Sequence, residues 1–231
     1  YGRSGVSIYD YENIGKLIQA IQKSPTLIFT GFYTHAGHSY YSRSKDEIEV
    51  ISKKVIKALR ELVSHYNYPI CFGDTPSCSI LEDFGDVTEI SPGNFVFYDW
   101  IQTKIGSCSI KDISVVMACP VVAKYESRSE LLVHGGAVHF SKDFDLDDDG
   151  NPYYGQVVTF NDDSWKPVIE DCYLKSISQE HGIVKCSPDF FNRIKVTDFI
   201  YIFPIHSCLT ADLMGRYLTT EGESITHLSK N

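Results

Sequence analysis

The chain has 231 residues, of which 43% are hydrophobic, and its 30 acidic residues outnumber its 21 basic residues to give a net charge of −9. This apolar content can bury one sizeable core or a larger and a smaller one, which excludes a disordered chain. With so few cations, we expect no nucleic-acid partner and no anionic membrane surface. The apolar runs fall far short of the roughly 20 residues that cross a bilayer, so we expect a soluble protein.

The first hundred residues alternate between helical and strand-like patterns. Apolar residues with a period near 3.6 predict a helix over residues 10–23, capped by Asp10, and a second helix over residues 48–63. Short apolar runs predict buried strands over residues 26–33 and 68–72. Strands alternating with helices indicate a parallel sheet with right-handed crossovers.

After Pro92-Gly93 the hydrophobic period changes to about two, which is typical of a β domain. We therefore expect the fold class α/β plus β, with a first domain over residues 1–105 and a mostly antiparallel β domain over residues 106–231. The expected strands of the second part cover residues 95–98, 114–123, 131–134, 155–160, 173–177, 183–186 and 199–203.

The seven cysteines are scattered without paired spacing and include no CxxC motif, which argues against a disulfide framework and for a reducing, cytoplasmic compartment. The opening Tyr-Gly-Arg-Ser-Gly resembles a loop that leaves a preceding strand. We therefore expect the chain to begin inside a domain, with part of the protein upstream.

His206-Ser-Cys208 is the most distinctive chemical motif. On an extended segment the side chains at i and i+2 point the same way, so the imidazole and the thiolate could hold one ion. Zn²⁺ accepts this pair of ligands, and two protein ligands would leave positions open for water or substrate. The alternative is an ordinary buried cysteine beside a surface histidine, because free cysteine usually lies in the core.

Two loops could bind a phosphate without a lysine cluster. Gly73-Asp-Thr-Pro-Ser77 and Ser91-Pro-Gly-Asn94 both follow expected strands, where backbone N–H groups and hydroxyls can surround an anion. Such sequences are also common as plain turns. The segment Gly31–His38 gathers aromatic and imidazole side chains at another strand exit, either as a functional loop or as a half-buried aromatic rim.

Other motifs predict structure rather than chemistry. Asp145-Leu-Asp-Asp-Asp-Gly150 imitates the start of a calcium loop, but Gln156 replaces the bidentate glutamate and the flanks resemble strands, so we expect a solvated acidic turn. The paired glycines of His134-Gly-Gly-Ala-Val-His139 are expected to allow a close approach of two backbones. The chain carries no serine-hydrolase, kinase or dinucleotide-binding motif.

Taken in order, six motifs resemble the eukaryotic, zinc-dependent D-serine dehydratases, a fungal member most closely. This family belongs to the fold-type III pyridoxal-phosphate enzymes, with alanine racemase and D-threonine aldolase as relatives. The resemblance extends to about residue 215. The motifs are Gly2-Arg-Ser-Gly5, Gly31-Phe-Tyr-Thr-His-Ala-Gly-His-Ser-Tyr40, Gly73-Asp-Thr-Pro-Ser77, Pro92-Gly-Asn-Phe-Val-Phe-Tyr-Asp99, His134-Gly-Gly-Ala-Val-His139 and His206-Ser-Cys208.

The resemblance implies that the chain holds the second half of a (β/α)₈ barrel, followed by a C-terminal β domain that carries the zinc ligands. The lysine that binds pyridoxal phosphate in the family would lie upstream, so the chain alone is expected to be inactive without the missing half of the barrel. A homodimer is expected by analogy with the fold-type III relatives.

The resemblance also implies the site residues. His206 and Cys208 would bind Zn²⁺. The residues expected around pyridoxal 5′-phosphate are Arg3 at the phenolic oxygen, Tyr33 and Tyr40 beside the ring and phosphate, Thr75 at the ring or phosphate edge, and the backbone N–H groups of Gly93 and Asn94 at the phosphate.

The implied activity is the α,β-elimination of D-serine to pyruvate and ammonia. One alternative is a D-threonine aldolase-like retro-aldol lyase, but that relative carries an aspartate where Cys208 stands, and oxygen ligation favours manganese-like ions. Another alternative is a non-catalytic protein that binds the cofactor or zinc.

Overall fold

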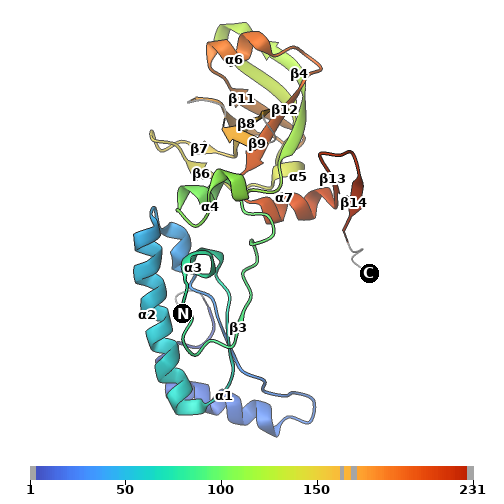
Figure 1. Ribbon diagram of the computed structural model, residues 1–231. Helices are drawn as coiled ribbons and strands as arrows, with labels where there is room; N and C mark the ends of the chain where they lie inside the picture. The colour runs from blue at the N-terminus through green and yellow to red at the C-terminus, as the bar shows by residue number, and fades with distance from the viewer. Residues whose placement is uncertain (1–3, 162–163, 168–170, 228–231) are drawn as a thin grey trace. The chain divides into compact units, whose positions relative to one another are not determined.

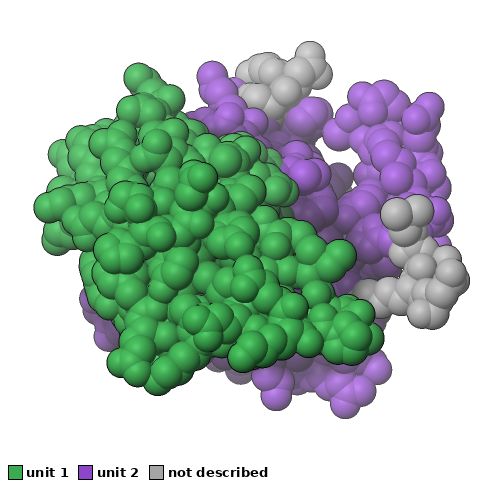
Figure 2. Space-filling model, turned by 90° about the horizontal axis from the view of Figure 1, so that it is seen from below, with its two compact units in different colours: residues 1–95, 104–108 green, residues 96–103, 109–231 purple. Residues whose placement is uncertain are grey.

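A computed structural model describes residues 4–161, 164–167 and 171–227 of the chain (Figure 1). These residues form two compact units (Figure 2). Unit 1 contains the residues up to Phe95 together with Lys104–Cys108, and unit 2 contains Val96–Thr103 and the residues from Ser109 onward. The predicted boundary after residue 105 falls within the stretch where the chain passes between the units.

Unit 1 is built on a three-stranded parallel sheet in the order β1-β2-β3, with Phe32 opposite Ile70 and Cys71 opposite Glu89. Helices connect the strands, as the alternating pattern predicts. The elements are α1 (Tyr11–Lys23), β1 (Phe32–Thr34), η1 (Gly37–Tyr41), α2 (Lys45–Tyr66), β2 (Ile70–Phe72), α3 (Thr75–Ile80) and β3 (Glu89–Ile90).

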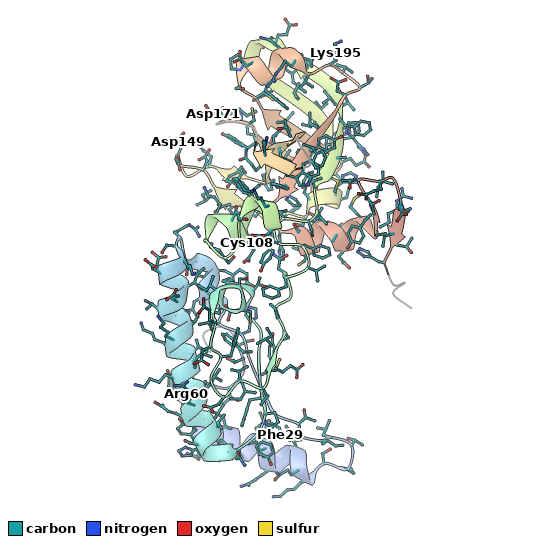
Figure 3. The ribbon with its side chains drawn as sticks, in the orientation of Figure 1. Phe29, Arg60, Cys108, Asp149, Asp171 and Lys195 are labelled. Carbon is teal, nitrogen blue, oxygen red and sulfur yellow. The ribbon has the colours of Figure 1, made fainter. Side chains whose placement is uncertain are left out.

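Both long helices of unit 1 confirm the predicted patterns. Asp10 caps α1 by accepting a hydrogen bond from the Asn13 N–H, and Ser44 caps α2 in the same way. The apolar face of α2 is buried in the core of the unit, whereas Arg60 on its other face is exposed and pairs with Asp86 (Figure 3). Helix α2 ends at Asn67, whose φ of 45° lies in the left-handed region.

Three predictions for this part of the chain are wrong in detail. Only Phe32 and Tyr33 of the predicted strand 26–33 pair with a neighbouring strand, and Ile28 is 87% exposed. The predicted loop Gly73–Ser77 enters helix α3 at Thr75, because Asp74 caps that helix. Residues 95–97 lie in a turn instead of a strand, and Tyr98 has a positive φ of 46°.

Unit 2 contains a closed, six-stranded antiparallel barrel in the order β10-β11-β5-β4-β12-β8. The pairing of Tyr173 with Gln156 joins β10 to β8 and closes the barrel, while β9 extends from the far end of β8. Six of the seven strands predicted for this part of the chain appear here, five of them with shifted ends, whereas β9 was not predicted. The strands are β4 (Met117–Tyr125), β5 (Glu130–His134), β8 (Gly155–Asn161), β9 (Ser164–Pro167), β10 (Tyr173–Ile177), β11 (His181–Lys185) and β12 (Phe199–Pro204).

The barrel encloses the main core of unit 2, which includes Cys119, Val133, Leu174 and Ile202, all fully buried. All seven cysteines of the chain are free thiols. The remaining elements are α4 (Trp100–Lys104), η2 (Ile110–Asp112), η3 (Glu126–Arg128), α5 (Ala137–Phe140), α6 (Pro188–Arg193), α7 (Ser207–Met214) and the hairpins β6 (Asp145–Leu146) with β7 (Pro152–Tyr153) and β13 (Arg216–Leu218) with β14 (Ser224–Thr226). Among the described helices, none combines the length and hydropathy that a bilayer crossing needs.

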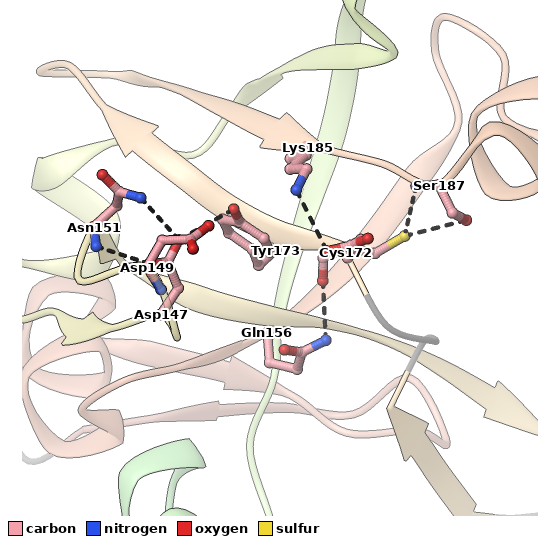
Figure 4. A network of polar contacts seen from close by, with 9 residues as sticks. Asp147, Asp149, Asn151, Gln156, Cys172, Tyr173, Lys185 and Ser187 are labelled. Atoms are coloured by element: carbon pink, nitrogen blue, oxygen red, sulfur yellow. Dashed lines mark hydrogen bonds and ion pairs between the residues drawn. The ribbon is translucent and has the colours of Figure 1, made fainter.

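The acidic turn after Asp145 is flanked by the strands β6 and β7, as predicted. The Asp147 carboxylate accepts hydrogen bonds from the N–H groups of Asp149 and Asn151 at 3.1 and 2.7 Å and from the Tyr173 hydroxyl at 3.4 Å (Figure 4). The Asp147 carboxylate therefore accepts hydrogen bonds from N–H groups of its own turn, as is usual for aspartate in turns.

Gly136 confirms the predicted close approach of two backbones. A Cβ atom added there would lie 2.6 Å from the Glu180 carbonyl carbon, the His181 nitrogen and the Ser178 oxygen. The N–H groups of Gly135 and Ala137 donate to the Glu180 and Ser178 oxygens at 2.9 and 2.8 Å, which holds the two segments together. The glycine is therefore required by backbone packing.

Candidate functional site

His206 and Cys208 lie where strand β12 passes into helix α7 in unit 2. His206 is the N-cap residue with an extended backbone (φ −132°, ψ 98°), and Cys208 lies in the first turn of the helix. The predicted extended geometry over all three residues is therefore wrong, because the helix already begins at Ser207. The motif nevertheless combines a rigid strand end with a helix start, two elements that hold side chains firmly.

The His206 ring is held by a residue that is distant in the sequence. Its Nδ1 atom lies 2.7 Å from Oδ2 of Asp143, and both side chains are partly exposed, by 38% and 49%. A carboxylate is only an acceptor, so Nδ1 carries the hydrogen in this contact. The Nε2 atom of the neutral ring then has a free lone pair and can act as a metal ligand.

The start of α7 is held by a second carboxylate, Asp99, which is fully buried. Its Oδ2 atom accepts a hydrogen bond from the Ser207 N–H at 3.2 Å, and its Oδ1 atom accepts one from the Gln102 N–H at 3.0 Å. Asp99 thus connects the first turn of α4 with the residue that lies between His206 and Cys208. Its negative charge also favours a cation nearby.

Substituting Asp99 with alanine is expected to lower the free energy of unfolding by about 2–4 kcal/mol, because two buried N–H groups lose their acceptor. Urea unfolding followed by circular dichroism would measure this loss. Asp198→Ala is a control, because the Asp198 carboxylate accepts an exposed hydrogen bond from the Lys195 N–H and the substitution leaves the backbone of Asp198 in place. Equal stabilities of the Asp99 variant and the control would contradict the role assigned to Asp99.

Burial raises the pKa of the Cys208 thiol to about 11, with a further contribution from the negative charge of Asp99. At neutral pH the thiol is therefore protonated, and metal binding would have to displace its proton. Tyr217, on strand β13, interacts electrostatically with Cys208, and burial raises the pKa of its phenol. The Tyr217 hydroxyl also forms a hydrogen bond with His227.

The donor set at the start of α7 fits Zn²⁺. It combines an imidazole nitrogen with a sulfur, and a carboxylate fixes the orientation of the imidazole, as is usual for metal-bound histidines. Among the described residues, no cluster of three or more histidine, cysteine or acidic side chains could hold a metal ion. Two protein ligands fill only part of a tetrahedral Zn²⁺ site, and catalytic sites differ from structural ones in keeping a position open for water or substrate.

In unit 1, the carboxyl ends of the three parallel strands bring several predicted cofactor residues together. The Tyr40 hydroxyl accepts a hydrogen bond from the Thr75 N–H at 3.4 Å, and Oγ1 of Thr75 accepts one from the Asn94 N–H at 3.1 Å. Tyr40, Thr75 and Asn94 thus form a connected series. The Asn94 N–H group therefore donates to Thr75. The hydrogen bond expected from this N–H group to a phosphate stays a prediction.

Tyr33 and Gly73 form a second contact at the same sheet edge. A Cβ atom added to Gly73 would lie 2.6 Å from the Tyr33 hydroxyl and 3.0 Å from Oγ of Ser91, so glycine makes room for both groups. At Gly93, an added Cβ atom would meet nothing within 4 Å. Arg3, the remaining predicted residue, lies outside the described residues.

These groups fit a phosphate in their chemistry, because hydroxyls and glycine-rich backbone bind phosphate where lysines are lacking. Buried polar atoms in the same unit support a polar ligand nearby. Oγ1 of Thr34 and Oγ of Ser77 have no hydrogen-bond partner among the described residues. Thr34 ends β1 and Ser77 lies in α3, on the two segments that carry Tyr33 and Thr75.

Sequence reasoning did not find Asp143 and found Asp99 only as the end of a motif. Asp143 follows Ser141 and Lys142 in an exposed polar stretch, where no pattern distinguishes it from the other aspartates. The separation of 63 residues between Asp143 and His206 is closed by the barrel, not by local structure. Asp99 could have been suspected as a helix cap, because it precedes the helical residues 100–104.

Comparisons with known proteins identify relatives of this chain. Residues 114–220 match the family described as "Putative serine dehydratase domain". The chain is 31% identical over 209 residues to a D-serine dehydratase of Dictyostelium discoideum, covering 82% of this chain and 50% of that protein. The predicted resemblance to the D-serine dehydratases is confirmed. A D-serine dehydratase of Schizosaccharomyces pombe is 28% identical over 245 residues, and the match covers 96% of this chain and 56% of that protein.

The fold of this chain resembles that of solved alanine racemase-like proteins. An alanine racemase-like protein from Idiomarina loihiensis matches with a TM-score of 0.80 and 26% identity, covering 97% of this chain and 60% of the other. D-threo-3-hydroxyaspartate dehydratase from Delftia sp. HT23 also matches with a TM-score of 0.80, at 23% identity, covering 97% and 62%. The chain thus spans about half the length of the curated relatives it matches.

Proposed function

We propose that the full-length protein is a D-serine dehydratase that converts D-serine to pyruvate and ammonia with pyridoxal 5′-phosphate and Zn²⁺. The observation that carries this proposal is the start of α7, where His206 is held by Asp143 and is followed two residues later by Cys208. The relatives named D-serine dehydratase support the substrate.

The architecture that goes with this function is half of a (β/α)₈ barrel followed by the β domain. The three parallel strands of unit 1, with α2 between β1 and β2, are the pattern of such a barrel. The Schiff-base lysine would come from the upstream half of the barrel. A homodimer is part of the proposal by analogy with the fold-type III enzymes.

Variants of one relative support the metal ligands. The solved structures of D-threo-3-hydroxyaspartate dehydratase include a cysteine-to-alanine mutant in the metal-free form and a histidine-to-alanine mutant altered two positions earlier. His206 and Cys208 have the same spacing and order. We therefore assign these two side chains to a divalent cation.

The residues of unit 1 would hold the cofactor. Pyridoxal phosphate, when bound, withdraws electrons from the Cα atom of an amino acid and so makes its proton acidic. Tyr40, Thr75, Gly93 and Asn94 would hold the phosphate, and the exposed Tyr33 would border the ring. Arg3 would neutralise the phenolic oxygen of the ring. By fixing the phosphate, these residues orient the substrate for proton loss.

The residues of unit 2 would serve the leaving group. Hydroxide is a poor leaving group, and a divalent cation supplies Lewis acidity to a departing oxygen. His206 would present Nε2 and Cys208 its thiolate to the cation, while Asp143 and Asp99 keep the two ligands in place. Thiolate ligation favours zinc, whereas the aspartate of D-threonine aldolases favours harder ions and retro-aldol cleavage.

A D-serine assay with and without metal tests this function. Purified full-length protein is expected to release pyruvate from D-serine, to lose this activity after treatment with a chelator, and to regain it with Zn²⁺. D-threonine and D-threo-3-hydroxyaspartate in parallel reactions distinguish an aldolase or a hydroxyaspartate dehydratase. Undiminished pyruvate release after verified metal removal, or no release by cofactor-loaded protein, would contradict the proposal.

A further inference from the structure

We propose that Asp143 is a positioning residue that fixes the His206 ring in the Nδ1–H tautomer, so that Nε2 is always available to the metal. This inference rests on the proposed function, because it concerns the metal ligands of that same site. Asp143 does not itself contact the metal or the substrate in this proposal.

Asp143 and His206 are in direct contact. Nδ1 of His206 lies 2.7 Å from Oδ2 of Asp143, the distance of a strong charge-assisted hydrogen bond. A neutral imidazole has a single N–H, and the carboxylate can only accept. The hydrogen therefore stays on Nδ1, and the lone pair stays on Nε2.

The backbone of Asp143 is held in place although its side chain lies at the surface. Ser141 has a positive φ of 69°, and its Oγ atom accepts a hydrogen bond from the Asp143 N–H at 3.1 Å. The preceding residue, Phe140, is buried, and its carbonyl accepts a hydrogen bond from Oγ1 of Thr210 at 3.4 Å. The loop that carries Asp143 is thereby attached to α7, the helix that His206 caps.

Asp143 also affects the entropy of metal binding. His206 is 38% exposed, so an unsupported ring could rotate and exchange tautomers. Metal binding would then restrict the ring to one orientation and one tautomer, at a cost in entropy. The Asp143 carboxylate removes these states in advance and also makes Nε2 a more basic ligand. Metal affinity, and not the stability of the fold, is therefore the property that Asp143 should control.

Zinc affinity tests the inference in the full-length protein. Metal-free samples of the parent, Asp143→Ala and Asp143→Asn are titrated with Zn²⁺ in competition with a chelating dye. The alanine variant is expected to bind about 10–100-fold more weakly, the range typical for lost partners of metal-bound histidines. The asparagine variant should fall between them, because its amide oxygen still accepts the Nδ1 hydrogen but carries no charge. Asp148→Asn, in the exposed turn of the same unit, should match the parent.

A second readout does not depend on the metal. In metal-free parent protein with ¹⁵N-labelled histidine, the His206 signals, assigned with a His206→Gln variant, should show a protonated Nδ1, and the Asp143→Ala variant should lose this preference. An Nε2–H tautomer in the parent, or equal zinc affinities of the parent and the alanine variant, would overturn the inference. A parent that binds no zinc at His206 and Cys208 would instead refute the proposed metal site.

Discussion

Substituting Cys208 with alanine in the full-length protein is expected to lower the rate of pyruvate release from D-serine more than a hundredfold. The variant loses one of the two proposed protein ligands of the metal, and with it the stabilisation of the leaving oxygen. A loss of about 3 kcal/mol of transition-state stabilisation is sufficient for this decrease. Steady-state assays with added Zn²⁺ measure it, and the metal content of the purified protein should fall in parallel.

The control for this experiment is Cys108→Ser, because Cys108 is also partly buried but lies outside the predicted site. Its activity should remain near that of the parent. The Cys208→Asp variant adds a test of ligand chemistry, since an oxygen ligand should weaken the preference for zinc over manganese. Activity of the alanine variant within threefold of the parent would contradict ligation by Cys208.

Substituting Gly136 with alanine is expected to destabilise unit 2 by about 3 kcal/mol or more. The new methyl group would lie 2.6 Å from three backbone atoms of residues 178–181, and backbone cannot move away as a flexible side chain can. Urea unfolding monitored by tryptophan fluorescence would report the loss, because both tryptophans, Trp100 and Trp165, lie in unit 2.

Val138→Ala is the matched control, because Val138 is close in the sequence and 44% exposed, so its truncation should cost less than about 1 kcal/mol. The Gly136 variant should also lose metal affinity, since the shifted segment leads into the loop that carries Asp143. A Gly136→Ala protein with the stability of the control would show that the two backbones can separate at little cost.

The long, strongly periodic elements could be predicted from the sequence. The apolar spacing of α2 and the Asp10 cap of α1 are local signals, and such signals act in any fold. Six strands of the β domain were also found, because alternation and turn residues mark them, whereas β9 was missed and the strand expected at residues 95–98 did not form. The failure at residues 26–31 has a physical reason, since an apolar run predicts a strand only where a partner strand is present.

The candidate site could be predicted only in part. The motif at residues 206–208 was visible because its two donors are adjacent in the sequence, although the expected extended geometry was wrong. Asp143 could not be predicted, because its contact with His206 depends on how the barrel and α5 bring two distant loops together. The series from Tyr40 through Thr75 to Asn94 likewise arises from parallel pairing of strands that are far apart in the chain.

The central claim is that His206 and Cys208 hold one divalent cation, and anomalous diffraction at the zinc edge from crystals of the active, full-length enzyme tests it most directly. We expect a single strong peak about 2.0–2.1 Å from Nε2 of His206 and about 2.3 Å from Sγ of Cys208. A peak bound by other side chains, or no peak in crystals of enzyme that still converts D-serine, would contradict it.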